Sequence, residues 1–145
     1  MGSKVLEVIS ASPELRAYAH CSKTGASQNQ RGAVTLLLIN LSNTTTAEID
    51  SVFLKTVGQN VLSYGYRQEY IISSAVSSDV EEDILQSKNV MLNGKLLSVT
   101  DYKVPELYPV VIDQEAKKSQ HSTAVVMAPL TYGFIVFPVA EASVC

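Results

Sequence analysis

The residues whose types could carry chemistry in this 145-residue chain are two cysteines, two histidines and a short run of carboxylates. His20 stands next to Cys21, a combination that can supply a base and a nucleophile. Both fall in residues 15–22, LRAYAHCS, where the residues alternate as in a half-buried β-strand. Neighbouring strand residues point to opposite faces, so the imidazole cannot reach the sulfur. We therefore interpret His20 as a strand residue that is hydrogen-bonded across an interface.

Cys21 and Cys145 are the only cysteines, and an even count invites pairing in an oxidising compartment. A bridge between them would close most of the chain into one loop and would stabilise the fold by about 4 to 5 kcal/mol in the chain-entropy model. Alternatively, Cys21 is a small core residue and Cys145 is an unpaired terminal residue. From the residues alone, both interpretations stay open.

Glu81, Glu82 and Asp83 lie in a polar stretch that we interpret as a loop with at most one helical turn at residues 80–85. General acid–base catalysis needs two carboxyl groups held by a scaffold on either side of one bond, so a solvated acidic loop is the better interpretation. The two histidines form no metal-binding signature, and no phosphate-binding or hydrolase motif occurs. We predict no catalytic, cofactor-binding or metal-binding residue.

Two glycosylation sequons follow each other closely. They are Asn40-Leu41-Ser42 and Asn43-Thr44-Thr45, and they lie where a strand should emerge into solvent. Two such triplets at a strand exit favour a secreted glycoprotein, with Asn40 and Asn43 as candidate sites. Crowding should limit glycosylation to one of the two.

Composition indicates one globular domain over residues 1–145, since 46% of the residues are hydrophobic and 17% are charged. The net charge of -3 gives no basic footprint for nucleic acid. No apolar run is long enough for a transmembrane helix, and residues 1–30 lack the apolar core of a signal peptide. We expect neither a membrane span nor a nucleic-acid partner.

The sequence GAVTLLLINLS, residues 32–42, has the strongest strand character. Its apolar residues fall on both faces, so we predict a central strand that is covered on both sides. A polar loop separates it from residues 15–22, which predicts a hairpin. The Asn93-Gly94 pair between two apolar triplets predicts a second hairpin of type I′. Pro129 predicts a bulge or a bend between sheets. We expect further strands at residues 44–54, 68–72, 110–112, 123–128 and 130–137.

Short strands, frequent turn signals and the absence of an amphipathic helix predict an all-β fold. We expect an antiparallel β-sandwich of about seven to nine strands.

In this order, the motifs resemble a known family. The segments MGSKVLEV, LRAYAHCSKT, GAVTLLLINLSN, VMLNGKLL and MAPLTYGFIVFPVAEASVC are similar to the C-terminal part of heparanase-like proteins, glycoside hydrolase family 79, and especially to the plant members. The most specific elements are the Arg16-x-Tyr18-x-His20-Cys21 string, the LLLINLSN strand and the terminal cysteine taken together. The resemblance covers nearly the whole chain.

The resemblance implies a β-sandwich beside a catalytic (β/α)8 barrel that lies outside this chain. It implies a Cys21–Cys145 disulfide, and it places Met1 inside the connection that leads from the barrel to the sandwich. The family's acid/base glutamate follows an asparagine, and no Asn-Glu dipeptide occurs here, so no catalytic residue can be carried over. The implied location is secreted, extracellular or lysosomal/vacuolar, with membrane association as a further option.

Two functions follow from this reasoning. In the first, the chain is the noncatalytic sandwich of a heparanase-like β-glucuronidase, and its partners are the barrel and an N-terminal strand of the parent enzyme. The glycan substrate would then be reached only through that enzyme, and the isolated chain should expose an apolar face or strand edge. In the second, it is a freestanding carbohydrate-binding or adhesion module, which should carry a coplanar cluster of exposed tyrosines.

Overall fold

A computed structural model shows an all-β protein. It describes residues 1–8, 12–23, 31–49, 54–56, 59–61, 66–75, 87–100, 102–103, 105–113 and 124–145. These residues form twelve strands and no helix. The strands are β1 Val5–Leu6, β2 Leu15–Cys21, β3 Val34–Asn40, β4 Ala47–Ile49, β5 Leu54–Thr56, β6 Gln59–Val61, β7 Tyr66–Ser74, β8 Val90–Leu92, β9 Lys95–Leu96, β10 Val110–Asp113, β11 Val125–Met127 and β12 Tyr132–Phe137. The predicted all-β class is confirmed, and the strand number exceeds the expected seven to nine because many strands have only two or three residues.

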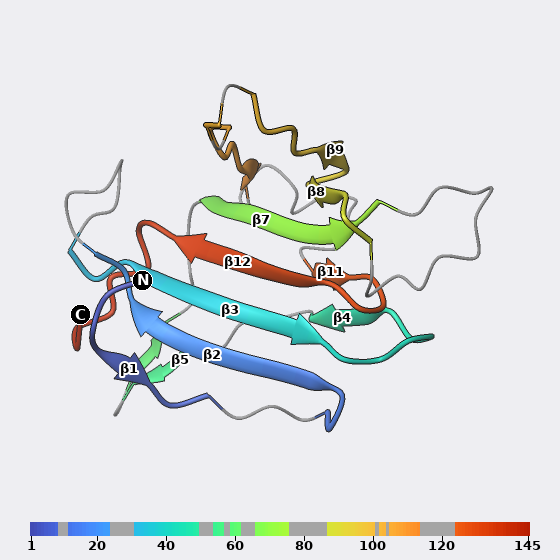
Figure 1. Ribbon diagram of the computed structural model, residues 1–145. Helices are drawn as coiled ribbons and strands as arrows, with labels where there is room; N and C mark the ends of the chain where they lie inside the picture. Colours follow the sequence, from blue (N-terminus) through green and yellow to red (C-terminus); the bar gives the residue numbers. More distant parts are fainter. Residues whose placement is uncertain are drawn as a thin grey trace.

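One large antiparallel sheet dominates the molecule (Figure 1). Its strand order is β1-β2-β3-β12-β7-β8-β9, and β10 pairs with the other half of β7. The predicted central strand is β3, which lies between β2 and β12. The predicted hairpin of β2 with β3 is also present, and Tyr18 pairs with Leu37 in its register.

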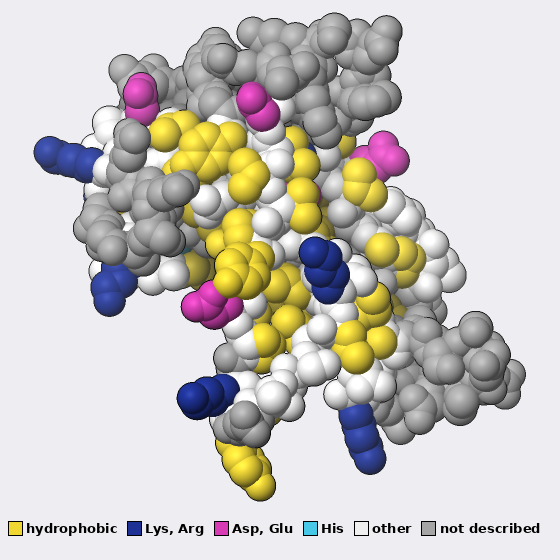
Figure 2. Space-filling model, turned by 90° about the horizontal axis from the view of Figure 1, so that it is seen from above, with side chains coloured by type: hydrophobic (Ala, Val, Ile, Leu, Met, Phe, Trp, Pro, Cys, Tyr) yellow, Lys and Arg dark blue, Asp and Glu magenta, His cyan; other side chains and the backbone are white. Residues whose placement is uncertain are grey.

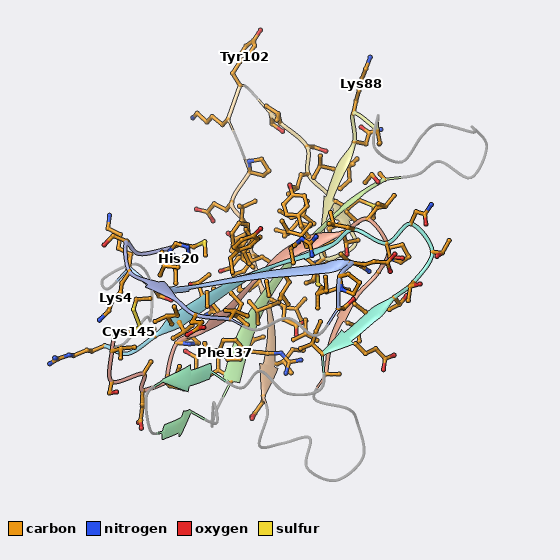
Figure 3. All side chains as sticks on the ribbon, turned by 90° about the horizontal axis from the view of Figure 1, so that it is seen from below. Lys4, His20, Lys88, Tyr102, Phe137 and Cys145 are labelled. Atoms are coloured by element: carbon orange, nitrogen blue, oxygen red, sulfur yellow. A yellow bond between two sulfur atoms is a disulfide. The ribbon has the colours of Figure 1, made fainter. Side chains whose placement is uncertain are left out.

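A second layer covers one face of this sheet. It contains the two-stranded sheet of β4 and β11 and the β5–β6 pair, and Figure 1 and Figure 3 show β4 and β5 on the same side of the large sheet. The core lies between the layers, and in Figure 3 Phe137 points from the large sheet toward the second layer. We call the face of the large sheet that lines this core the inner face. Its buried residues include Val34, Leu36, Leu38, Ile135 and Phe137, and the second layer contributes Val125 and Met127.

The chain passes from the second layer to the large sheet around Pro129, as predicted. β11 pairs with β4, whereas β12 pairs with β3 and β7. Leu130 turns this corner with a positive φ of 52°. The backbone amide of Leu130 donates to the carbonyl oxygen of Ser42, and the amide of Asn40 donates to that of Thr131, both at 2.9 Å. These two bonds fasten the corner to the end of β3.

The Asn-Gly hairpin is confirmed between β8 and β9. Asn93 and Gly94 have φ values of 49° and 76°, and a type I′ turn requires positive φ at both positions. The Asn93 side chain also ties the turn to β7, because its oxygen accepts from the Ile71 amide and its nitrogen donates to the Glu69 carbonyl oxygen.

Other strand predictions agree in part. The edge strand expected at residues 110–112 is β10, which pairs with β7. The strand expected at residues 44–54 contains β4 and the start of β5, with residues 50–53 outside the described part. The helical turn expected at residues 80–85 also lies outside it. β1 was not predicted, since two residues carry no periodicity.

Candidate interaction surface

The two cysteines form a disulfide between β2 and the C-terminal end of the chain. The Cα atoms of Cys21 and Cys145 are 5.3 Å apart, across a sequence separation of 124 residues. The N-terminal segment meets the same place, because the Gly2 amide donates to the Cys21 carbonyl oxygen and the Cys21 amide donates to that of Lys4. The ammonium group of Lys4 also donates to the Val144 carbonyl oxygen. Figure 3 shows Lys4, His20 and Cys145 at this one end of the sheet.

His20 has a structural contact and no contact with the sulfur beside it. Its Nδ1 lies 3.1 Å from the carbonyl oxygen of Gly2, which can only accept a hydrogen bond. Cys21 is on the opposite face of β2 and is oxidised in the disulfide. The imidazole therefore helps to fix the N-terminal segment, in keeping with its interpretation as a hydrogen-bonded strand residue.

One described carboxylate, that of Glu69, has a charged partner. Glu69 is paired with Arg67 at 2.6 Å, and both side chains are largely buried. Arg67 also donates to the carbonyl oxygen of Ala124, at 3.1 Å, so its charge links β7 to the start of β11. Its burial was not predicted, although Arg67 alternates with Glu69 and Ile71 on one face of β7. Glu81, Glu82 and Asp83 lie outside the described residues. Within the described part of the chain, no group of three His, Cys, Asp or Glu residues could hold a metal ion.

The two predicted glycosylation sites occupy opposite environments. Asn40 is the last residue of β3, is 2% exposed and lies on the inner face. Its side-chain nitrogen lies within 3.1 Å of the carbonyl oxygens of Thr45, Met127 and Ala128. The structure thus gives the Asn40 side chain a buried role in hydrogen bonding. Asn43 is exposed.

The other face of the large sheet, which we call the outer face, is turned toward the viewer in Figure 1. Directly paired residues point to the same side of a sheet, so the registers define its members. Tyr18 pairs with Leu37, Leu37 with Phe134, and Phe134 with Tyr70; one step along, Ile39 pairs with Tyr132 and Tyr132 with Ile72. The outer apolar face therefore consists of Tyr18, Leu37, Ile39, Tyr70, Ile72, Tyr132, Phe134 and Val136, on the four neighbouring strands β2, β3, β12 and β7.

These side chains are only partly covered. Tyr18 is 49% exposed and Tyr132 is 43% exposed, whereas Leu37, Ile39 and Phe134 between them are half-buried. Partial burial raises the pKa of the Tyr70 phenol, because desolvation disfavours its charged form. The prediction that β3 is covered on both faces is therefore only half fulfilled within the described part of the chain. Its inner face is sealed, and its outer face is not.

Polar residues border the outer apolar face. Arg16 and His20 lie on β2 beside it, and Gln68 lies on β7. Arg16 is directed to the Pro13 carbonyl oxygen, at 2.6 Å. An apolar centre with a polar border is the usual anatomy of a protein interface.

Exposed apolar side chains also occur on the strands beyond β7. By the same pairing rule Val111 lies on the outer face, whereas Val110 and Leu96 lie on the opposite face. Val110 and Val111 of β10 are 44% and 57% exposed, and Leu96 of β9 is 56% exposed. Figure 2, which looks onto the side of β7, β8 and β9, shows hydrophobic side chains across the middle of that side, with most charged side chains toward its margins. At the same edge, Tyr102 and Lys88 project away from the sheet on the side opposite to the second layer (Figure 3). Tyr102 is fully exposed and so covers none of the face.

No helix in the described residues is long and apolar enough to cross a membrane.

Sequence comparison relates the chain to part of several larger proteins, although no protein-family model matches it. "Heparanase-like protein 1" of Arabidopsis thaliana is 35% identical over an alignment that covers the whole chain and 28% of that protein. "Heparanase" of Bos taurus is 29% identical over the whole chain and 24% of its own length. "Inactive heparanase-2" of Homo sapiens is 27% identical over 91% of the chain and 19% of its own length. The chain thus spans little more than a quarter of the Arabidopsis relative.

Proposed function

Because the chain is related to heparanase-like proteins along its whole length, we propose that it is the noncatalytic C-terminal β-sandwich of such a protein. In this proposal the catalytic barrel of the parent enzyme, a β-glucuronidase or heparanase-like hydrolase, cleaves the O-glycosyl bond. The sandwich packs against that barrel and stabilises it. The parent enzyme would act outside the cell, at a membrane surface, or in a lysosome or vacuole.

The observation that carries the proposal is the outer apolar face. Eight apolar or aromatic side chains on four adjacent strands form one surface, and the described second layer covers only the other side of the sheet. Soluble proteins rarely leave an apolar patch of this kind without a partner. A large domain that the chain itself does not contain would provide the cover, and an N-terminal strand of the parent enzyme would pair at an edge of the sheet.

The energy available from such cover is substantial. Completing the burial of one half-exposed Leu, Ile or Phe side chain contributes about 1 kcal/mol. Complete burial of five or six such side chains contributes roughly 5 kcal/mol before the entropy of association is subtracted. In one polypeptide that entropy loss is smaller than for two separate proteins, because the linker keeps the domains together. A sandwich and a barrel of one chain would therefore stay docked.

The carboxylates support a noncatalytic role. Hydrolysis of a glycosidic bond uses two carboxyl groups on either side of the bond. In the described part of the chain, Glu69 is neutralised by Arg67, and Glu106 accepts a hydrogen bond from Tyr108. Neither pair places two carboxylates around a shared space.

A freestanding glycan-binding module remains the second candidate, because Tyr18, Tyr70 and Tyr132 lie on one face. Aromatic rings can stack on sugars. Leu37, Ile39 and Phe134 fill the space between these tyrosines, however, and this centre suits a protein partner better than a hydroxylated ligand.

The test compares two matched variants of the isolated chain. Tyr18→Glu with Tyr132→Glu places charge on the outer apolar face, whereas Val126→Glu places charge on β11, where Val126 is 53% exposed. We expect the wild-type chain and the Val126 variant to bind a hydrophobic dye and to self-associate in sedimentation. The tyrosine variant should do neither. A monomeric wild-type chain that binds no dye would contradict the proposal and favour the freestanding module. In that case, the wild-type chain should bind a glycan and the tyrosine variant should not.

A second experiment addresses the partner. The catalytic region of an Arabidopsis relative, ending where the match to this chain begins, is secreted with and without this chain. We expect the chain to increase the yield of folded, active barrel, and we expect the tyrosine variant to fail where the Val126 variant succeeds. Equal yields under all four conditions would contradict docking through this face.

A further inference from the structure

The end of β3 and the turn that follows it contain two adjacent acceptor patterns for the same modification. The sequons at Asn40 and Asn43 are separated by two residues, and both satisfy the acceptor pattern for N-linked glycans. The acceptor pattern alone does not distinguish the two asparagines. The structure separates them, because Asn40 is 2% exposed and Asn43 is exposed.

Asn40 uses its whole side-chain amide inside the protein. Its nitrogen lies 2.8 Å from the Thr45 oxygen, 3.0 Å from the Met127 oxygen and 3.1 Å from the Ala128 oxygen, and all three are backbone carbonyls. Its side-chain oxygen accepts from the Ser42 amide at 3.1 Å. The side chain therefore joins the turn to the corner between β11 and β12.

A glycan on Asn40 is incompatible with these bonds. A primary amide has two N–H hydrogens, and an N-linked sugar replaces one of them. At least one of the carbonyl contacts would be lost, and a sugar ring would have to occupy space that the core fills. Burying unpaired carbonyl groups costs about 1 to 3 kcal/mol each, and the displaced packing adds to this cost.

Asn43 meets the opposite conditions. It is exposed, as are Thr44 and Thr45, and no hydrogen bond of the Asn43 side chain is found among the described residues. The turn keeps its shape without that side chain, because the Ser42 hydroxyl oxygen accepts from the Thr45 amide at 3.0 Å and from the Thr44 amide at 3.4 Å. A substituent on Asn43 would disturb none of these contacts.

We propose that Asn43 carries an N-linked glycan in the folded protein and that Asn40 does not. The donor is a polyprenyl-diphosphate-linked oligosaccharide in the secretory pathway. The Asn43 side-chain nitrogen attacks the anomeric carbon, so a C–N bond forms and the bond from that carbon to the phosphate oxygen breaks. The polyprenyl diphosphate leaves, and the amide proton passes to a base of the transferase.

The position of Asn43 is compatible with a covered outer face. Figure 1 shows the turn after β3 at the end of the sheet opposite to the two termini. A glycan there stands away from the disulfide end of the sheet, next to one end of β3. Glycosylation of Asn43 does not require the proposed docking partner.

The test uses the full chain behind a cleavable secretion leader in a eukaryotic host. Folded protein from the medium and from the secretory lumen is treated with peptide N-glycosidase in heavy-oxygen water, which converts a glycosylated asparagine to labelled aspartate. Cleavage after Arg31 and Lys55 leaves both asparagines on one peptide, so fragment-ion spectra must locate the label. We expect one label, at residue 43. A label at residue 40, or no label at all, would overturn the proposal.

Matched variants exclude an indirect effect. Thr45→Ala removes the acceptor pattern at Asn43 and keeps the Asn43 side chain, whereas Thr45→Ser keeps the pattern. We expect complete loss of the glycan in Thr45→Ala and in Asn43→Gln, and an unchanged glycan in Thr45→Ser. Retention of a glycan in Thr45→Ala would contradict the assignment, since the remaining sequon belongs to Asn40.

Discussion

Removal of the Cys21–Cys145 disulfide should cost the protein a large part of its stability. The bond joins residues 124 positions apart, and the chain-entropy model assigns about 5 kcal/mol to a loop of that size. Ordinary domains have about 5 to 15 kcal/mol in total. The disulfide therefore decides whether the isolated chain is stably folded.

The structure indicates that the measured loss will fall somewhat below this value. The Gly2 and Cys21 backbones stay hydrogen-bonded without the bridge, and Ala140 and Ala142 remain part of the core, at 2% and 1% exposed. Residual structure in the unfolded chain lowers the entropic gain further. We expect a loss of about 3 to 5 kcal/mol.

Urea unfolding gives the measurement, followed by tyrosine fluorescence because the chain has no tryptophan. Cys145→Ser is the preferred variant, since Cys21 is only 7% exposed and a serine there would add the cost of a buried hydroxyl. Reductant should destabilise the wild-type protein and leave Cys145→Ser unchanged. Equal stability of the oxidised and reduced wild type, or peptide mapping with both thiols free in protein from an oxidising compartment, would refute the reasoning.

Three further predictions concern a matched pair of glycines, a tyrosine and the catalytic chemistry. Gly94→Ala should cost about 1 kcal/mol in unfolding free energy from its φ of +76° alone, since an added Cβ meets nothing within 4 Å. Gly32→Ala should cost about 2 kcal/mol or more, because its φ is +88° and its Cβ would approach the Glu141 and Ala142 backbone at 2.9 Å; equal losses for both glycines would contradict this. The hydrogen bond to Glu106, with its charge, raises the pKa of the Tyr108 phenol, so the phenol ionises at higher pH than an ordinary tyrosine; Glu106→Gln should lower that pKa in a spectrophotometric titration, and an unchanged curve would argue against the bond. The isolated chain should not hydrolyse an aryl β-glucuronide, and turnover that copurifies with it and is lost in a Glu81→Gln, Glu82→Gln variant would contradict a noncatalytic role.

Local chemistry explains which parts of the fold were predictable from sequence. The Asn93-Gly94 hairpin and the corner at Pro129 depend on backbone preferences of a few residues, and both are present. β3 was recognisable because its composition excludes a surface helix. β1 has only two residues and forms through its pairing with β2, so no local pattern identifies it.

The burial of Asn40 was not predicted, because Asn40 was considered only as part of a sequon and its position in the strand was not used. Asn40 follows Val34, Leu36 and Leu38 in steps of two, and that parity places it on the inner face. The same parity places Arg67 with Glu69 and Ile71 on β7. Alternation therefore held enough information to find both residues, whereas their partners, Ala124, Met127 and Ala128, come from distant segments that no local pattern identifies.

The outer face of β3 carries apolar residues that the described structure does not explain. A strand that needs only one covered face can place polar residues on the other, as antiparallel sheets with one solvated face do. β3 instead carries Leu37 and Ile39 there, and Phe134 and Tyr132 stand beside them on β12. These side chains contribute little to a core that is already closed on the inner face by Val125 and Met127. An apolar centre with polar neighbours at Arg16 and Gln68 is the arrangement expected of a second contact surface, and the proposed docking against a larger domain would account for its extent across four strands.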